Sequence, residues 1–121
     1  MNGIRHGFLR MFPILDHLLL EDYQHVYEPS DDTFLLCDAL EQDMQQGILG
    51  SNMSIACEVG CGSGCVITHL ARLYQEMKHP LFCLGVDINP KALEVTNRTG
   101  IRNGILLIHS FSHILTYSFT L

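Results

Sequence analysis

Three glycines at every second position, Gly60, Gly62 and Gly64, constrain the fold of this chain more than any other feature. They close the segment 57–64, Cys-Glu-Val-Gly-Cys-Gly-Ser-Gly, whose first residues are typical of the end of a buried strand that enters a tight turn. Further along, an apolar run ends in Asp87. A strand, a glycine turn, a helix and a second strand with an acid at its end form a βαβ nucleotide-binding unit.

The spacing of the glycines indicates which ligand such a turn would bind. A dinucleotide site uses Gly-x-Gly-x-x-Gly, which brings backbone N–H groups and a helix N-terminus to a pyrophosphate. Here the glycines alternate, and the carboxylate of Glu58 stands two residues before Gly60. This order resembles the first motif of methyltransferases that use S-adenosylmethionine (SAM). The sulfonium and ammonium groups of SAM favour a nearby carboxylate, so we prefer SAM to NAD.

Length and charge exclude several classes of protein. With 121 residues, 47% of them hydrophobic, the chain can form one small domain but is shorter than a complete doubly wound sheet normally needs. Its formal charge of −6 and its seven scattered Lys and Arg residues argue against binding along a nucleic-acid backbone. No apolar run of about 20 residues is free of polar interruptions, so we expect no transmembrane helix.

The five cysteines are an odd number, which makes a disulfide framework unexpected and favours a reducing compartment, the cytoplasm with the nucleus as an alternative. Cys57, Cys61 and Cys65 flank the glycine turn, but no second pair of ligands stands at a spacing suited to zinc. We therefore interpret them as packing residues and predict no metal site.

Periodicity and capping signals predict an α/β fold, a partial Rossmann-like doubly wound sheet. Its three domain segments are an N-terminal extension over 1–23, a cofactor-binding half over 24–104, and a divergent tail over 105–121. Phe34, Leu35, Leu36, Leu70 and Leu73 are predicted core residues. The expected elements are a short helix over 15–23, a helix capped by Ser30 or Asp31 that fades at 47–50, a strand over 55–59, a helix over 65–78, a strand over 81–86 covered on both faces, a helix from Asn89-Pro90 to about Asn97 that stops near Gly100, and a third strand over 105–108.

Three segments in order resemble the HemK-like glutamine methyltransferases. They are 26–36, Val-Tyr-Glu-Pro-Ser-Asp-Asp-Thr-Phe-Leu-Leu, then 57–64, then 87–92, Asp-Ile-Asn-Pro-Lys-Ala. The first segment points to the eukaryotic and archaeal branch, and the resemblance covers roughly residues 24–104. It implies SAM-dependent methylation of the glutamine side chain in the Gly-Gly-Gln motif of class-1 translation release factors. It also implies a small zinc-binding activator subunit as partner.

By position, the resemblance implies that Thr33, Glu58, Gly60, Gly62 and Asp87 bind SAM. Asp87 would accept hydrogen bonds from the ribose hydroxyls, and Glu58 would lie near the methionine ammonium. Gly60 and Gly62 would let the backbone approach the ligand without a Cβ in the way. Each polar residue also has a purely structural interpretation, as a helix-capping acid (Asp87), a structural carboxylate (Glu58) or a helix-start threonine (Thr33).

The sequence departs from the family in two places. The catalytic Asn-Pro-Pro-Tyr motif is absent, and the family's adenine-side aspartate, expected near Ser112-His113-Ile114, has no counterpart. We therefore predict no catalytic residue and expect the cofactor half of an enzyme, as a splice product or as a gene-model fragment. Three functions stay open: a release-factor methyltransferase, an inactive form that at most binds SAM or the activator subunit, and, less favoured, a DNA adenine methyltransferase.

Overall fold

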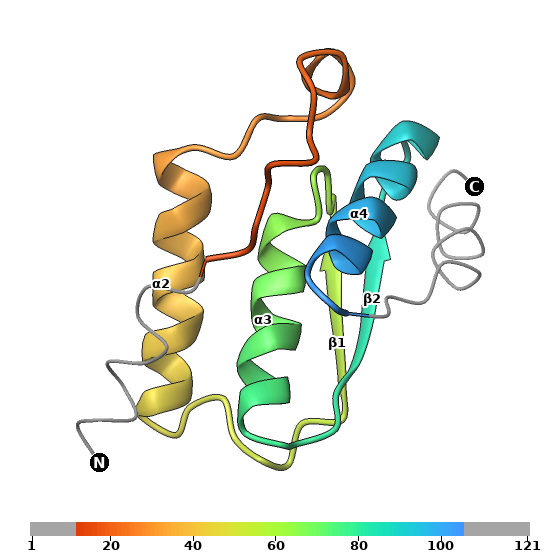
Figure 1. The fold of residues 1–121 in the computed structure, drawn as a ribbon. Helices are drawn as coiled ribbons and strands as arrows, with labels where there is room; N and C mark the ends of the chain where they lie inside the picture. The colour runs from red at the N-terminus through yellow and green to blue at the C-terminus, as the bar shows by residue number, and fades with distance from the viewer. Residues whose placement is uncertain (1–11, 106–121) are drawn as a thin grey trace.

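The computed structural model describes residues 12–105, in which helices and strands alternate along the chain (Figure 1). The predicted third strand over 105–108 and the tail lie outside the described residues, except for Ile105, which is in no strand. The elements are the 3₁₀ turn η1 (Asp22–Gln24), α2 (Asp31–Gln45), β1 (Ile55–Val59), α3 (Cys65–Glu76), β2 (Phe82–Val86) and α4 (Pro90–Arg102).

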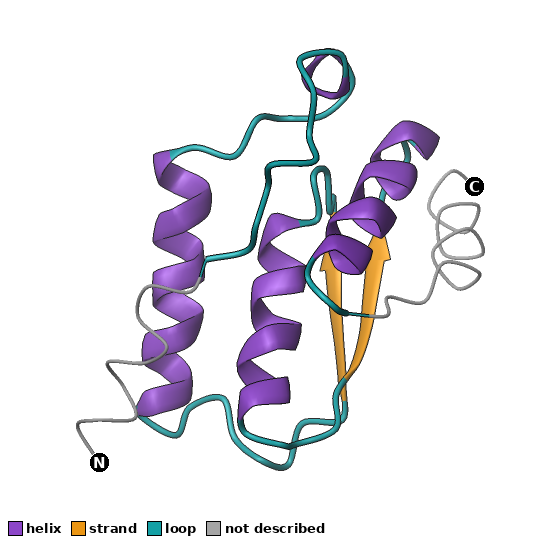
Figure 2. Cartoon of the chain, viewed as in Figure 1, coloured by secondary structure: helices purple, strands orange, loops and turns teal. Residues whose placement is uncertain are grey.

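The two strands form a parallel sheet, with Ile55 paired to Phe82 and Val59 paired to Val86. A parallel pair needs a crossover connection, and α3 supplies it. The carboxyl ends of both strands therefore meet at one edge, and the glycine turn leaves from the same edge. The predicted α/β class is confirmed, and the described residues form part of a doubly wound fold (Figure 2).

Helices cover one face of the sheet. Ala56 and Cys83 pack against Ile67 and Ala71 of α3, and α4 lies over β2 on the same side, while α2 packs on α3 (Figure 1). Because side chains alternate along a strand, Ile55 and every second residue after it in β1 point to the opposite face of the sheet.

No helix among residues 12–105 covers that opposite face. Ile55 is 64% exposed, Val59 66% and Phe82 37%. The predictions of a buried first strand and of a second strand covered on both faces are therefore wrong for these side chains. An apolar strand sequence indicates burial on both faces in a complete sheet, but it does not show which covering elements the described residues include.

A narrow stripe of α2 contacts α3. Cys37 and Glu41, one helical turn apart, are buried, and Glu41 Oε1 lies 3.7 Å from Nε2 of the buried His69 on α3. The predicted core residues Leu35 and Leu36 are instead 69% and 48% exposed, which corrects that prediction. They lie on other sides of α2, whose main contact among the described elements is with α3.

The segment before α2 packs on α4, but it is not the predicted helix over 15–23. Only Asp22–Gln24 form a 3₁₀ turn, where the Asp22 carboxylate accepts a hydrogen bond from the N–H of Leu19. A short polar side chain that bonds to nearby backbone competes with helix formation. Leu18 and Val26 are nevertheless buried, because they pack against Ala92 and Val95 of α4.

The last helix runs five residues beyond its predicted end at Asn97, to Arg102. Gly100, the predicted stop, is a buried helical residue, whereas Gly104 has φ +73° and closes the helix. A glycine in this left-handed conformation satisfies the last carbonyls, and here the N–H of Ile105 donates to Gly100 O at 2.8 Å. The predicted start is confirmed, since the Asn89 side chain accepts a hydrogen bond from the N–H of Lys91.

Candidate functional site

The glycine turn between β1 and α3 is the centre of the candidate site. The N–H groups of Gly60 and Cys61 both donate to Val86 O, at 2.7 and 3.1 Å, which ties the turn to the end of β2. Gly60, Gly62 and Gly64 have φ of +78°, +54° and +81°, values that favour glycine. A Cβ on Gly60 or Gly62 would meet nothing within 4 Å, so a ligand has room to approach the backbone there.

The turn packs closely on α4. A Cβ on Gly64 would lie 2.7 Å from Thr96 Cα, so this glycine is needed for the approach of helix and turn. The Thr96 hydroxyl donates to Gly62 O at 3.0 Å, and the Thr99 hydroxyl donates to Ser63 O at 2.7 Å. These buried threonines fix the shape of the turn from behind.

A cavity of about 190 Å³ opens in front of the turn. It brings together four of the five predicted site residues, Thr33, Glu58, Gly60 and Gly62, from α2, the end of β1 and the turn. The remaining lining residues are Tyr27, Asp32, Leu36, Cys61, Ser63, Cys65 and Val66.

Asp87, the fifth predicted site residue, borders the cavity through Gly62 and does not line it. One carboxylate oxygen accepts the N–H of Gly62 at 3.1 Å, and the other accepts the N–H of Asn89 at 2.9 Å. The carboxylate thus joins the end of β2 to the glycine turn and to the start of α4. A carboxylate in this position can cap the start of a helix, and the same position is compatible with contact to a ligand in the neighbouring cavity.

Glu58 is the half-buried carboxyl of the site. Its Oε1 accepts the N–H of Ile67, in the first turn of α3, at 3.1 Å. The residue before α3 is Gly64, which offers no capping side chain, so Glu58 takes that role. Burial raises the pKa of Glu58 to about 7, against the lowering effect of the Ile67 hydrogen bond, and the nearby Asp87 charge raises it further. A carboxyl held in this way favours a cationic partner.

Thr33 opens α2 at the rim of the cavity. Its Oγ1 accepts the N–H of Ser30 at 3.2 Å, so this hydroxyl takes part in capping the helix. Thr33 therefore has the structural role of a helix-start threonine. Because it also lines the cavity, a ligand bound there could still contact it.

Among the cavity residues that were not predicted as site residues, Tyr27 and Asp32 are joined by their side chains. The Tyr27 hydroxyl donates to the Asp32 carboxylate at 3.0 Å, and Ser30 Oγ donates to the same oxygen at 2.7 Å. The Ser30 and Tyr27 hydrogen bonds hold the pKa of Asp32 below its ordinary value. The Tyr-Glu-Pro-Ser-Asp-Asp-Thr segment was the signal that could have indicated both residues.

The chemistry of these residues fits the cationic end of SAM. The cavity offers a half-buried carboxyl at Glu58, an acid at Asp32 and open backbone at Gly60 and Gly62, and no Lys or Arg lines it. Its 190 Å³ falls below the roughly 300 Å³ at which typical small-molecule sites begin. The cavity formed by the described residues is therefore smaller than a typical complete site for a small molecule.

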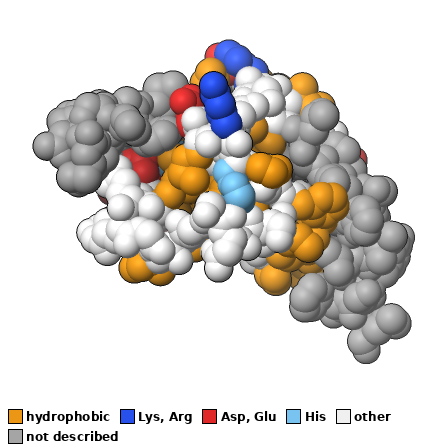
Figure 3. All heavy atoms as spheres, turned by 90° about the horizontal axis from the view of Figure 1, so that it is seen from below, with side chains coloured by type: hydrophobic (Ala, Val, Ile, Leu, Met, Phe, Trp, Pro, Cys, Tyr) orange, Lys and Arg blue, Asp and Glu red, His pale blue; other side chains and the backbone are white. Residues whose placement is uncertain are grey.

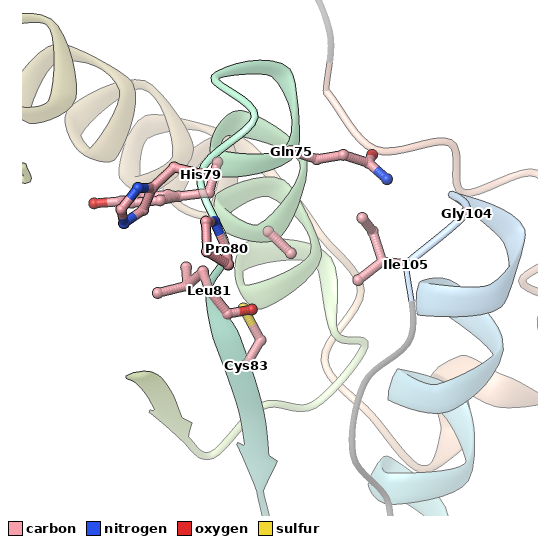
Figure 4. A pocket seen from close by; sticks show the side chains of 9 residues that line it. Gln75, His79, Pro80, Leu81, Cys83, Gly104 and Ile105 are labelled. Atoms are coloured by element: carbon pink, nitrogen blue, oxygen red, sulfur yellow. The ribbon is translucent and has the colours of Figure 1, made fainter. Parts of the chain in front are cut away.

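A second cavity, of about 330 Å³, lies at the opposite end of the strands, where hydrophobic side chains reach the surface (Figures 3 and 4). Its lining includes His79, Leu81 and Ile105, the last of which ends the described chain. In open α/β folds ligands bind at the carboxyl ends of the strands, so this larger cavity is the poorer candidate.

Among residues 12–105, no group of three or more His, Cys, Asp or Glu side chains is arranged to hold a metal ion. No helix in the same range is long and apolar enough to cross a membrane.

Parallel β1 and β2, the glycine turn, the crossover helix α3 and a carboxylate at the end of each strand define part of a class I methyltransferase fold. The chain is 36% identical over 93 residues to the eRF1 methyltransferase catalytic subunit mtq2 of Schizosaccharomyces pombe. It is likewise 36% identical over 93 residues to the methyltransferase HEMK2 of mouse and to that of human. The predicted resemblance to the HemK-like methyltransferases is thereby confirmed.

The matched residues make up 75–77% of this chain but only 40–41% of each relative. The chain thus spans about two fifths of the length of the curated relatives that it matches. No protein-family model matches it.

Proposed function

We propose that this chain carries the SAM-binding half of a protein-glutamine methyltransferase. The observation that supports the proposal most is the half-buried Glu58 carboxyl in a cavity that also contains the open backbone of Gly60 and Gly62. SAM would supply the transferable methyl group when bound. The chain's own residues would hold its cationic methionine end at Glu58 and its ribose at Asp87.

The substrate that we propose is the glutamine amide of a class-1 release factor. One relative is an eRF1 methyltransferase catalytic subunit, which suggests both a release-factor substrate and a partner subunit for proteins that contain this region. An amide nitrogen is a weak nucleophile, so the main task of the protein is to orient it towards the sulfonium and to exclude water.

For this chain by itself we propose cofactor binding without methyl transfer. The 121 residues contain no Asn-Pro-Pro-Tyr, the motif that the resemblance to the HemK-like enzymes assigns to gripping the substrate amide. Release-factor methylation is thus proposed for longer proteins with this region, and SAM binding for the chain.

Calorimetric titration of SAM into the full chain and into Asp87→Ala tests the proposal. Losing a charge-assisted hydrogen bond to the ribose should cost about 1.5–3 kcal/mol, roughly a tenfold to 150-fold rise in Kd. Asp22→Ala is a matched control, because Asp22 pairs with Arg98 away from the cavity. Equal affinity in wild type and Asp87→Ala would refute the assignment of Asp87.

A further inference from the structure

We propose that His17, in the segment before α2, positions the glycine turn through a hydrogen-bond relay that runs over Thr99 to Ser63. His17 does not line the cavity, so it would act on a bound ligand only through these two residues. The relay can be tested without a ligand, and only its effect on SAM binding rests on the proposed function.

Side chains at the end of α4 hold the segment before His17 in place. Asn103 Oδ1 accepts the N–H of Ile14 at 2.7 Å, and Asn103 Nδ2 donates to Ile14 O at 2.9 Å. One amide side chain therefore binds both backbone groups of a single residue. Arg102 donates to both carboxylate oxygens of Asp16, each at 2.9 Å, which is the strong bidentate form of this pair. His17 follows directly, so the docked segment fixes where its ring meets α4.

The hydrogen bonds of the relay have a defined direction. His17 Nε2 lies 3.0 Å from Thr99 Oγ1, and the Thr99 hydroxyl donates to Ser63 O at 2.7 Å. A threonine hydroxyl has one hydrogen, and a carbonyl oxygen can only accept. Thr99 therefore accepts from His17, which assigns the proton of the imidazole to Nε2.

The relay is shielded from water. Thr99 is 0% exposed and Ser63 7%, and Nδ1 of His17 is buried without a hydrogen-bond partner among the described residues. Burial also lowers the pKa of His17, which favours the neutral ring with its single proton on Nε2. Solvent cannot easily replace a hydrogen bond lost in such a place, so each link of the relay should matter to the turn.

The His17 donor matters because the Thr99 hydroxyl has a competing acceptor. In a helix a threonine hydroxyl commonly donates to the carbonyl one turn before it, here that of Val95. A hydrogen bond from His17 to the Thr99 oxygen directs the hydroxyl hydrogen towards Ser63 instead. Ser63 lines the cavity next to Gly62, so this hydrogen bond holds part of the cavity wall. By reciprocity, a ligand bound there should tighten the segment around His17.

Amide hydrogen exchange of the full chain, followed residue by residue by NMR, tests the relay without a ligand. His17→Leu removes the donor and keeps an apolar side chain. The N–H groups of Gly62 and Gly64 should then exchange about two- to twelvefold faster, the factor that one hydrogen bond contributes. The exchange of Leu70 in α3 is the reference for overall stability. His17→Gln keeps an N–H donor and should restore most of the slow exchange at the turn.

Two further variants separate the relay from a general loss of stability. His79→Leu removes a histidine hydrogen bond of the same 3.0 Å length, to Met53 O, and should leave the turn unchanged relative to Leu70. Thr99→Val removes the middle of the relay. Combined with His17→Leu, it should add nothing further at the turn, because both changes break the same contact. Should Thr99→Val not fold, the comparison of His17→Leu with His17→Gln still decides the question.

Titration of SAM extends the test to the candidate site. In the wild type SAM should slow the exchange of the Ile14 and Leu18 amides, although neither residue lines the cavity. His17→Leu should raise the Kd of SAM by about the same two- to twelvefold factor. A wild type that does not bind SAM would refute the proposed function, and the exchange experiment without ligand would still decide on the relay.

Four results would overturn the proposal. They are turn amides that follow Leu70 in His17→Leu, a loss in His17→Gln as large as in His17→Leu, additive effects of His17→Leu and Thr99→Val, and SAM binding that leaves Ile14 and Leu18 unchanged. The ¹⁵N shifts of the His17 ring give an independent check, because a proton found on Nδ1 would break the relay at its first step.

Discussion

Replacing Glu58 by glutamine should stabilise the protein at alkaline pH while leaving its stability near pH 4 unchanged. Burial raises the pKa of Glu58 from 4.5 to about 7, so the native state holds this proton more tightly than the unfolded chain does. Between these two pH values the folded protein binds more protons. Its free energy of unfolding therefore falls as the pH rises.

The magnitude follows from the size of the shift. A rise from 4.5 to about 7 corresponds to at most about 3.4 kcal/mol at about 1.36 kcal/mol per unit of pKa, and solvent in the open cavity should reduce it to roughly 2 kcal/mol. Glutamine keeps an oxygen that can accept the Ile67 N–H, so the cap of α3 survives the change. The variant should therefore gain about 2 kcal/mol over the wild type above pH 8.

Urea unfolding of both proteins between pH 4 and pH 9 gives the measurement. Side-chain hydrogen bonds lower the pKa of Asp16, Asp22 and Asp32, and this affects the stability of the wild type and of the variant alike. The difference between the two curves of stability against pH therefore isolates the effect of Glu58. The difference should grow from near zero to its full value as the pH passes from 4.5 to 7. Parallel curves across this range would refute the assignment of a half-buried, proton-binding Glu58.

Three further predictions concern the turn, the activity and the tail. Gly64→Ala should destabilise the protein by about 1–3 kcal/mol in urea, because its Cβ would lie 2.7 Å from Thr96 Cα. Gly47→Ala, at φ +80° with nothing within 4 Å of the new Cβ, measures the cost of the backbone conformation alone. An equal loss of stability in both variants would show that the contact with Thr96 contributes nothing to the loss in Gly64→Ala. Incubation with radiolabelled SAM, a release factor and an activator subunit should put no label on the Gly-Gly-Gln glutamine, and clear label there would contradict the proposed inactivity. The uncharged, proline-free sequence over 114–119 should promote self-association over activator binding, and a soluble 1:1 complex in size-exclusion chromatography would count against this.

The sequence predicted the elements whose signals are local. The glycine turn, the Ser30 and Asn89 helix starts and the parallel strand pair depend on backbone requirements that a few neighbouring residues reveal. Three predicted site residues, Glu58, Gly60 and Gly62, meet in one cavity for the same reason, since a βαβ unit brings the turn and the strand ends together, whereas Thr33 joins them from α2.

What the sequence did not predict depends on packing between distant segments. Leu35 and Leu36 are apolar but exposed, because the main contact of α2 among the described elements is with α3. Gly100 fits inside α4 because it is buried there, and only Gly104 takes the left-handed conformation that ends a helix. Asp32 became part of the cavity through the Tyr27 hydrogen bond, which no periodicity indicates.

We propose that SAM binds in the glycine-turn cavity and not in the larger cavity at the other end of the strands. Titration of SAM into the ¹⁵N-labelled chain, followed by NMR, locates the binding site residue by residue. We expect the amide signals of Gly60 and Gly62 to shift, together with others in the segments 30–36, 58–66 and 87–89. Shifts confined to His79, Leu81 and Gly104, or no shifts at saturating SAM, would contradict it.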